Sequence, residues 1–242
     1  MGRARIGDSD SEVSPVEEMK RRAAEASLRL IRPGMVLGLG TGSTARYVLE
    51  GIARLISRGV AVKGIPTSLT TAKVARILGI PLTSLEEHPH PDLAIDGADE
   101  VDPKFNLIKG MGGALFRERI VAAAAKKFVV VVDESKLVRR LGTNAPVPVE
   151  VHPFGWRTAV ESLGRLGAQS QLRQRGDEPF RTDNGNYILD AAFGPIRAPT
   201  RLAADIRSIP GVVDHGLFLG MTHAVVVGTK KRTLILRPTR RI

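Results

Sequence analysis

The stretch MVLGLGTGSTARYVLEGIARLISRGVAVKGIPTS, residues 35–68, contains one complete strand–helix–strand unit. The apolar run 35–40 is typical of a buried strand. The segment 43–59 has apolar residues at helical spacing. A second strand is expected over 60–68. Two strands joined through one helix predict a parallel pair.

The same alternation continues on both sides of this unit. A helix is expected before it, over 16–31, where the sequence ends in the helix-stopping RPG. Strands that alternate with helices over the first ~140 residues predict an α/β fold with a Rossmann-like, mostly parallel sheet flanked by helices on both faces. The expected elements after residue 68 are helix 69–79, short strand 81–85, strand 92–96, helix 113–127 and strand 128–133.

The pattern changes near residue 145. Helices and strands of an α+β type are expected there: helix 155–167, strand 169–175, turn 182–186, strand 187–193 and helix 199–209. We expect 211–220 and 223–229 to return to the first domain as strands. The predicted organisation is a flexible N-terminal tail (1–15), a discontinuous Rossmann-like catalytic domain (16–145 and 212–242) and a smaller inserted α+β domain (146–211).

Composition excludes several classes of function. The chain has 242 residues and no cysteine, which excludes disulfides, cysteine–zinc sites and thiol nucleophiles, and favours a cytoplasmic location. No apolar run approaches the roughly 20 residues that span a membrane, so we expect no membrane partner. The first residues, MGRARIGDSDSEVSP, lack an apolar signal core, so we expect no export.

The net charge of +11 is consistent with nucleic acid, an anionic surface or an anionic substrate as partner. Basic runs such as KKRTLILRPTRRI (230–242) contain almost no aromatic residues, which make up 4% of the chain. Bases therefore have few side chains on which to stack. We interpret the charge as solvated surface and expect no nucleic-acid partner. Retention on DNA at physiological salt would contradict this interpretation.

The segment GLGTGSTA (38–45) lies at a strand-to-helix junction. Its glycines allow the backbone to turn tightly and to approach a ligand closely. The N–H groups of the new helix and the hydroxyls of Thr41, Ser43 and Thr44 suit a phosphate group. The alternative is a helix cap with a turn. The segment fits neither the Walker nor the dinucleotide pattern, so no nucleotide cofactor is predicted.

The segment IDGADE (95–100) places Asp96 and Asp99 at the carboxyl end of a strand, where open α/β sheets bind ligands. Both carboxylates can converge on one substrate. The alternative is an Asx-type turn. Two carboxylates are a weak metal signal, and His88 and His90 lie in a proline-rich connector. We therefore predict no metal site.

The segment KGMGGAL (109–115) joins a lysine to a loop that opens a helix. Lys109 can neutralise a developing oxyanion, or it can be an ordinary surface lysine. Glu118 falls in the first turns of the helix, where the dipole favours the carboxylate and suits a general base. Stabilisation of the helix is the alternative. In VVDESK (131–136), Lys136 is a phosphate contact or a solvated charge.

Together, GLGTGSTA, IDGADE, IKGMGGALFRE and VVDESKLV resemble type A ribose-5-phosphate isomerase, in this order and at these separations. The resemblance extends from about VEEMK to GLFLGMTHAVVVG. Two departures are mild: Met111 stands where the motif often has glycine, and Arg117 and Arg119 bracket Glu118, which makes this carboxyl somewhat more acidic than the motif alone suggests.

The resemblance implies interconversion of D-ribose 5-phosphate and D-ribulose 5-phosphate through an enediol(ate), without metal or organic cofactor. It implies that Glu118 is the base, that Asp96 assists ring opening and that Lys109 stabilises the enediolate. Asp99 shapes the polar pocket. The residues implied to bind substrate are Thr41, Gly42, Ser43, Thr44, Asp96, Gly97, Ala98, Asp99, Lys109, Gly110, Met111, Gly112, Lys136 and Lys20.

The resemblance also implies a homodimer or homotetramer. A sugar-phosphate lactonase, an amino-sugar-phosphate deaminase and a ligand-sensing protein of the same fold are the alternatives. The set of Asp96, Asp99, Lys109 and Glu118 favours the isomerase over them.

Overall fold

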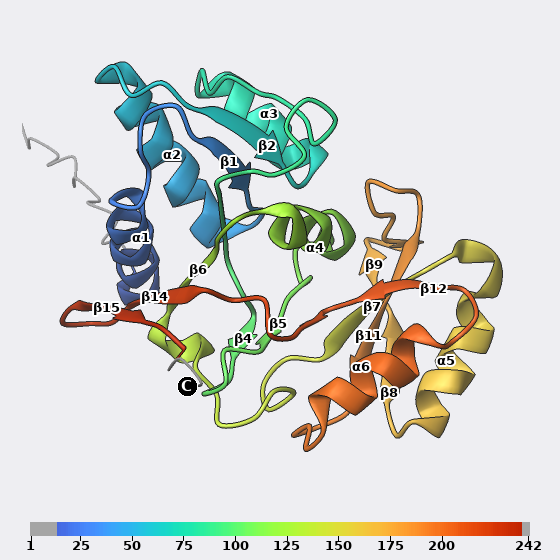
Figure 1. The fold of residues 1–242 in the computed structure, drawn as a ribbon. Helices are drawn as coiled ribbons and strands as arrows, with labels where there is room; N and C mark the ends of the chain where they lie inside the picture. The colour runs from blue at the N-terminus through green and yellow to red at the C-terminus, as the bar shows by residue number, and fades with distance from the viewer. Residues whose placement is uncertain (1–13, 239–242) are drawn as a thin grey trace, which may run out of the picture.

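The computed structural model describes residues 14–238 and confirms the α/β architecture (Figure 1). Its largest sheet has six strands in the order β15-β14-β6-β3-β1-β2. Neighbouring strands are parallel, except for the antiparallel pair of β14 and β15. The strands are β1 (Val36–Leu39), β2 (Lys63–Pro66), β3 (Leu93–Asp96), β6 (Phe128–Asp133), β14 (Ala224–Gly228) and β15 (Thr233–Leu236).

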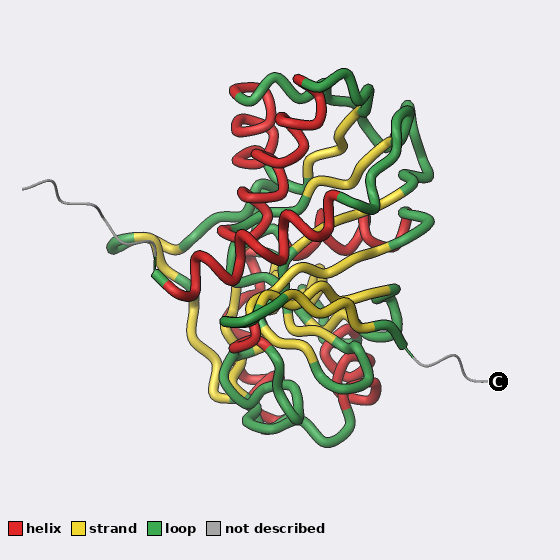
Figure 2. Tube along the Cα trace, turned by 90° about the vertical axis from the view of Figure 1, so that its left-hand side faces the viewer, coloured by secondary structure: helices red, strands yellow, loops and turns green. Residues whose placement is uncertain are grey.

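Helices cover both faces of this sheet, as the sequence predicts. Successive residues of a strand point to opposite faces. Val129 and Val131 therefore pack with α1 and α2, whereas Val130 and Val132 pack with α4. In the view turned by 90°, α1 crosses the side of the molecule nearest the reader (Figure 2). The helices are α1 (Pro15–Leu28), α2 (Ser43–Ser57), α3 (Leu69–Ile77) and α4 (Leu115–Ala124).

Serine side chains fix where two of these helices begin. The Ser14 hydroxyl accepts the Glu17 N–H at 3.3 Å, and the Ser68 hydroxyl accepts the Thr71 N–H at 3.0 Å. Each satisfies a donor that the first helical turn leaves free. Because α1 begins at Pro15, the predicted tail 1–15 is too long by its last residues. The rest of that tail lies outside the described residues.

A second, antiparallel sheet has the order β12-β7-β11-β8. Two helices pack on it around a core that includes Val149, Leu163, Leu189 and Ile206 (Figure 1). This is the smaller α+β part that the sequence predicts. Its elements are β7 (Val147–Val151), α5 (Trp156–Arg165), β8 (Gln169–Leu172), β11 (Tyr187–Ala192), α6 (Pro199–Arg207) and β12 (Val212–His215).

Short elements connect the two larger sheets. In a three-stranded sheet, β5 lies between β4 and β13, and it delivers the chain to Lys109. A two-stranded hairpin, β9 with β10, extends from the second sheet. The short elements are β4 (Glu100–Val101), β5 (Leu107–Ile108), β9 (Gln174–Arg175), β10 (Glu178–Pro179), β13 (Leu217–Phe218) and the 3₁₀ helices η1 (Glu134–Lys136) and η2 (Pro153–Gly155).

The chain returns to the first sheet later than predicted. The prediction assigned residues from 212 onward to the first domain, but β12 pairs with β7 in the second sheet. Only residues 208–211 separate α6 from β12. Such a short connection brings the chain to the nearest strand rather than to another sheet. The return is completed by β14, which pairs with β6.

Three further predictions differ in detail. The predicted strand 81–85 is reduced to a single bridge between Leu82 and Gly64, because Pro81 has no N–H to donate. The predicted helix 113–127 is shorter, since Gly113 has a positive φ of 79° and stays outside α4. The strand β7 was not predicted. Within residues 14–238, the helices are too short or too polar to cross a membrane.

Candidate active site

The candidate site lies at the carboxyl ends of β1 and β3. These strands are neighbours, and β1 has β2 on its other side. The chain thus leaves β1 toward β2 on one side and later returns in β3 on the other side of β1. The connections that follow β1 and β3 therefore run in opposite directions and leave a crevice at the carboxyl ends of these two strands. Gly40 follows β1, and a Cβ at this position would lie 2.2 Å from Asp96 Oδ1. Only glycine leaves room for the carboxylate here.

Three buried charged side chains form the centre of the site. Lys109 Nζ lies 3.0 Å from Asp96 Oδ2 and 3.2 Å from Glu118 Oε2, and it donates to the carbonyl of Gly97 at 2.6 Å. Asp96 ends β3, Lys109 follows β5 and Glu118 lies in the first turn of α4. The three residues are at most 4% exposed. The structure thus brings together the residues that the sequence analysis placed at the chemical centre.

The two carboxylates share one ammonium group but differ in their other contacts. Asp96 Oδ1 also accepts the N–H groups of Thr41, at 3.1 Å, and Gly97, at 2.7 Å. Glu118 Oε2 is buried without a hydrogen bond of good geometry. Asp96 is therefore the better stabilised anion, and Glu118 binds a proton more tightly.

Burial and electrostatics shift the pKa values of the whole cluster. Burial, together with the charge of Asp96, raises the pKa of Glu118 to about 8. The expectation that Arg117 and Arg119 make this carboxyl more acidic is wrong, because their side chains bond to Asn184 and Asp214. Burial also raises the pKa of Asp96, against the opposing effect of Lys109. For Lys109, burial alone would lower the pKa, but the carboxylates of Asp96 and Glu118 outweigh it and raise the pKa. The lysine remains a cation, and Glu118 becomes a base of intermediate strength.

Asp99 lies beside this cluster, on the turn that follows β3. Its Oδ2 accepts the Met111 N–H at 3.1 Å, so the carboxylate is tied to the loop between β5 and α4. Burial raises the pKa of Asp99, and the hydrogen bond from Met111 and the charge of Lys109 oppose this shift. Gly110 opens the loop with a positive φ of 112°, a conformation that favours glycine.

Cations and hydroxyls gather at the other end of the site. The turn at Gly42 has a positive φ of 113° and opens α2 at Ser43. Lys20 of α1 donates to Ser43 Oγ at 3.1 Å and is held by Glu17 at 2.6 Å. Lys136 ends η1, which the carboxylate of Asp133 caps. A helix N-terminus with two nearby lysines is a suitable environment for a phosphate group.

A cavity of about 260 Å³ joins the two ends. Among the predicted residues, only Asp96 does not line it; this carboxylate lies just behind, in contact with Lys109. The lining residues are Lys20, Thr41, Gly42, Ser43, Thr44, Gly97, Ala98, Asp99, Lys109, Gly110, Met111, Gly112, Glu118 and Lys136.

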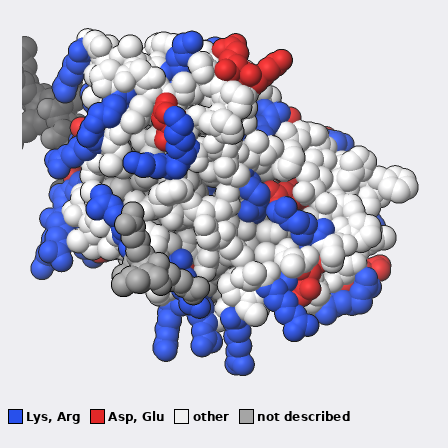
Figure 3. Space-filling model, viewed as in Figure 1, with Lys and Arg blue, Asp and Glu red and all other residues white. Residues whose placement is uncertain are grey.

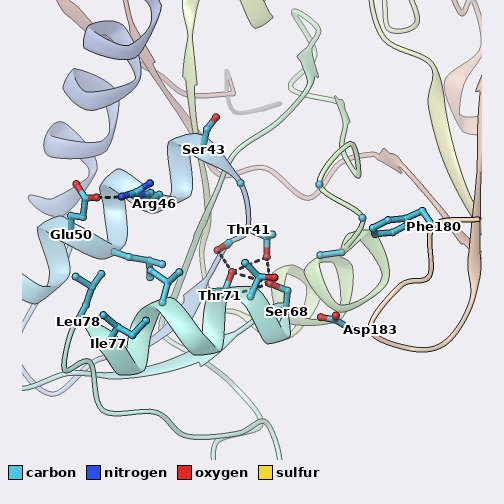
Figure 4. Close-up of a pocket in the computed structure, with 18 of the residues that line it drawn as sticks. Thr41, Ser43, Arg46, Glu50, Ser68, Thr71, Ile77, Leu78, Phe180 and Asp183 are labelled. Atoms are coloured by element: carbon cyan, nitrogen blue, oxygen red, sulfur yellow. Dashed lines mark hydrogen bonds and ion pairs between the residues drawn. The ribbon is translucent and has the colours of Figure 1, made fainter. Parts of the chain in front are cut away.

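The hydroxyl of Thr41 faces away from this cluster. Its Oγ1 lies 2.9 Å from Thr67 Oγ1, 2.9 Å from Ser68 Oγ and 3.0 Å from Thr71 Oγ1. Figure 4 shows Thr41 directed toward Ser68 and Thr71 at the start of α3, beside a larger neighbouring cavity of about 640 Å³. What Thr41 gives to the charged cluster is its backbone N–H, which bonds to Asp96.

Sequence reasoning missed residues that support the site from a distance. Glu17 holds Lys20 and also accepts a hydrogen bond from Tyr47 at 2.7 Å. Thr67 bonds to the carbonyl of Leu39 at 2.9 Å, and Arg173 contacts the loop after Lys109. None of them belongs to a local motif, so no pattern in the sequence singled them out.

The histidine His215 contacts Arg119 and does not line the cavity. His215 is buried, and burial together with the nearby charge of Arg119 lowers its pKa to about 4. In the part of the chain that the structure describes, no three His, Cys, Asp or Glu residues are grouped so that they would hold a metal ion.

Comparison with known proteins identifies the family. Residues 63–232 match the family model of ribose 5-phosphate isomerase A, also called phosphoriboisomerase A. A ribose-5-phosphate isomerase A of Roseiflexus sp. is 54% identical over 211 residues, which cover 86% of this chain and 91% of that protein. A probable chloroplastic ribose-5-phosphate isomerase of Arabidopsis thaliana is 49% identical over 88% of this chain and 81% of its own.

Solved structures agree with this result. A D-ribose-5-phosphate isomerase in complex with phospho-erythronic acid has a TM-score of 0.90 and 42% identity, covering 92% of this chain and 99% of that one. Ribose 5-phosphate isomerase A of Methanocaldococcus jannaschii has a TM-score of 0.87 and 41% identity, covering 91% and 99%. This chain belongs to the ribose 5-phosphate isomerase A family.

Proposed function

We propose that this protein is an aldose–ketose isomerase that interconverts D-ribose 5-phosphate and D-ribulose 5-phosphate. The observation that carries the proposal is the contact of Lys109 with both Asp96 and Glu118 at the wall of a 260 Å³ cavity. A base and a fixed cation side by side are what a proton transfer next to a carbonyl group requires. Family membership favours this activity over a lactonase, a deaminase or a sensor.

The reaction begins with the opening of the furanose ring, in which the anomeric hydroxyl loses a proton and the ring oxygen gains one. Asp96 assists this step through Lys109, because its carboxylate lies behind that lysine and does not line the cavity. Glu118 then removes the proton from C2 of the open aldose. The electron pair of that C–H bond forms the C1–C2 double bond, and the carbonyl oxygen on C1 takes up negative charge. Lys109 stabilises this charge. The hydroxyl proton on the C2 oxygen then passes to the C1 oxygen, and Glu118 returns its proton to C1. The C2 oxygen thereby becomes the carbonyl of the ketone, so the reaction needs no oxidant.

The remaining predicted residues hold the substrate. Ser43, Thr44, Lys20 and Lys136 bind the phosphate group, with the Gly42 turn at the start of α2. Thr41 acts through its backbone, because its hydroxyl bonds to α3. The solved relative with phospho-erythronic acid is consistent with this arrangement. That molecule combines a phosphate with a carboxylate, which resembles an enediolate in charge. The cavity wall is completed by Gly97, Ala98, Asp99, Gly110, Met111 and Gly112.

Proton NMR tests the function directly. The protein is incubated with D-ribose 5-phosphate in deuterium oxide with EDTA. We expect ribulose 5-phosphate to form and deuterium to enter beside the carbonyl. Unchanged ribose 5-phosphate would contradict the proposal, and inhibition by EDTA would contradict the predicted metal independence.

The role of Glu118 is tested by Glu118→Gln in the same assay. The amide keeps the shape but accepts no proton, so we expect kcat to fall by about 10²–10⁴-fold with little change in substrate binding. Glu86→Gln is the control, because Glu86 is exposed and does not line the cavity. Turnover by Glu118→Gln at the wild-type rate would exclude Glu118 as the base.

Two further predictions go beyond catalysis. We infer a homodimer or homotetramer, which sedimentation velocity at several protein concentrations tests. A cytoplasmic location remains the prediction from the absence of cysteine, and cell fractionation tests it.

A further inference from the structure

An arginine from the second sheet reaches into the loop of the candidate site. Arg173 lies between β8 and β9. Its Nη1 donates to the carbonyl of Gly110 at 2.8 Å and to that of Met111 at 3.0 Å. Both carbonyls belong to the loop that runs from Lys109 to α4. The proposed function did not use this residue.

Arg173 is itself held firmly. Its Nε donates to Asp190 Oδ2 at 2.9 Å, and its Nη2 pairs with Asp190 Oδ1. The two side chains are 13% and 20% exposed. A two-point contact between arginine and a carboxylate fixes the plane of the guanidinium group. The backbone is fixed as well, since the Arg173 N–H donates to Ile188 at 2.9 Å and its carbonyl accepts from Phe180 at 2.8 Å.

Because a peptide bond is planar, a carbonyl that Arg173 holds also fixes the direction of the N–H in the same peptide, which faces the cavity. In a trans peptide the C=O and the N–H point in opposite directions, and the described chain has no cis peptides. The peptide between Gly110 and Met111 has its C=O on Arg173 and its N–H on Asp99. One peptide unit is therefore held between the second sheet and a predicted catalytic carboxylate.

The next peptide is held in the same way. Its C=O, on Met111, bonds to Arg173, so the N–H of Gly112 is directed to the opposite side. Gly112 lines the cavity. Among the hydrogen bonds of residues 14–238, none uses this N–H. Without Arg173, the Met111 carbonyl would lose its hydrogen bond, and the Gly110 carbonyl would keep only the one from the Gly113 N–H at 3.0 Å.

We propose that Arg173 is a positioning residue of the isomerase: through the carbonyls of Gly110 and Met111 it holds the Met111 N–H against Asp99 and so orients that carboxylate in the cavity. The proposal rests on the function proposed above. Asp190 supports it by fixing the guanidinium plane. Arg173 acts through the loop and touches no substrate.

A purely structural role predicts a different result. If Arg173 only joined two parts of the fold, its loss would lower stability without changing the chemistry of the folded protein. In the proposed role, its loss weakens the hydrogen bond that Asp99 accepts and removes a nearby positive charge. Both contributions oppose the rise in the pKa of Asp99. The acid limb of kcat/KM depends on two ionisations, that of Glu118 with a pKa of about 8 and that of Asp99. The part of the limb that Asp99 causes should then move to higher pH.

The test compares Arg173→Gln and Arg173→Lys with the wild type. We expect Arg173→Gln to lower kcat by about 10- to 100-fold, the size expected for a misplaced catalytic group, and to move the part of the acid limb that Asp99 causes to higher pH. Arg173→Lys, which keeps the charge and one donor, should restore part of both. Arg175→Gln is the control, because Arg175 is a neighbouring arginine that also stacks on Phe180 but does not bond to the carbonyls of Gly110 and Met111. An unchanged pH profile with only a lower melting temperature would overturn the proposal.

A double-mutant cycle decides whether Arg173 acts through Asp99. The loss caused by Arg173→Gln should be much smaller in an Asp99→Asn background, since the group that it positions is already altered. Equal losses in both backgrounds would overturn the proposal. If Arg173→Gln does not fold, Asp190→Asn and Arg173→Lys supply the same comparison. Wild-type protein without turnover would refute the proposed function itself, which separates the two failures.

Discussion

At the scale of single residues, the decisive feature is that Lys109 lies between two buried carboxylates. If Asp96, Glu118 and Lys109 are all ionised, the cluster has a net negative charge in a poorly solvated place, which is costly. A proton on Glu118 relieves this cost, because Asp96 has the additional N–H donors. Two carboxyl groups in contact with one lysine thereby acquire different proton affinities and can take different roles.

This arrangement predicts how stability depends on pH. The pKa of Glu118 is about 8 in the folded protein and near the ordinary value of 4.5 in the unfolded chain. Between these values the folded state binds the extra proton, so the contribution of Glu118 to the unfolding free energy is complete below pH 4.5 and is lost as pH rises to about 8. Glu118→Gln lacks this titration. The melting temperature of Glu118→Gln minus that of the wild type should therefore increase as the pH rises from 4.5 to about 8.

Calorimetry at several pH values measures the difference. Val226→Ala is the control, because it removes buried apolar volume from β14 without removing a titratable group. Its difference from the wild type should be constant with pH, whereas that of Glu118→Gln changes. A constant difference for both variants would mean that Glu118 keeps its ordinary pKa.

The sequence identified the groups at this scale but not all their directions. Asp96, Asp99, Lys109 and Glu118 lie in local motifs, so their proximity could be predicted. The rotation of the Thr41 hydroxyl toward α3 depends on Ser68 and Thr71, which come from another element. The contact of Arg173 joins residues 63 and 62 positions apart, and no short pattern encodes such a contact.

At the scale of elements, close backbone contacts position the site. The helix α1 packs on the end of β14, where a Cβ on Gly228 would lie 1.8 Å from the carbonyl oxygen of Met19. Met19 precedes Lys20, which lines the cavity. The absence of a side chain on one strand residue thus determines how near a lysine on a helix comes to the predicted phosphate position.

Gly228→Ala should therefore affect both stability and binding. The added methyl group meets backbone, which cannot rotate away, so we expect a loss of about 1–3 kcal/mol in unfolding free energy. Because α1 moves outward with Lys20, KM should rise several-fold while kcat changes less. Gly164→Ala in α5 is the control, since nothing lies within 4 Å of its added Cβ. If KM for Gly228→Ala equals that of the wild type, the packing of α1 does not position Lys20.

Helices and strands with a long apolar pattern were predicted well, whereas strands that form only because a neighbouring strand pairs with them were predicted poorly. The run FVVVVD forms β6, and its residues are all buried. VPVEV, which forms β7, was not predicted as a strand, since Pro148 and the flanking Pro146 and Pro153 suit a connection equally well. It becomes a strand because β11 and β12 pair with it on both sides. The place of β12 in the second sheet is likewise determined by its partner β7, not by its own sequence.

At the scale of the whole molecule, the net charge of +11 bears on how substrate arrives. Lys and Arg side chains are spread over much of the face shown in Figure 3, with fewer acidic side chains among them. A phosphorylated sugar carries a charge of about −1.5 to −2 at neutral pH. A positive field around the protein attracts such a substrate from beyond contact distance. We therefore interpret the charge as one that attracts a small anionic substrate.

This interpretation predicts a dependence on ionic strength. Sodium chloride at about 0.01 M leaves a screening length of about 30 Å, and about 0.1 M shortens it to about 10 Å. We expect kcat/KM for D-ribose 5-phosphate to fall several-fold between these conditions, mainly through KM, because Lys109 and Glu118 are buried and screened little. Phosphate and sulfate are avoided, since they would compete for the predicted phosphate site.

Two controls separate attraction from other effects of salt. Sucrose in place of salt changes viscosity but not screening, so it should leave the electrostatic part of KM unchanged. The melting temperature, measured in both salt concentrations, shows whether salt acts on the fold. A field of several kT around the cavity must weaken when the screening length falls below the size of the protein, and kcat/KM should fall with it. An equal kcat/KM at both ionic strengths would therefore mean that the surface charge does not guide the substrate.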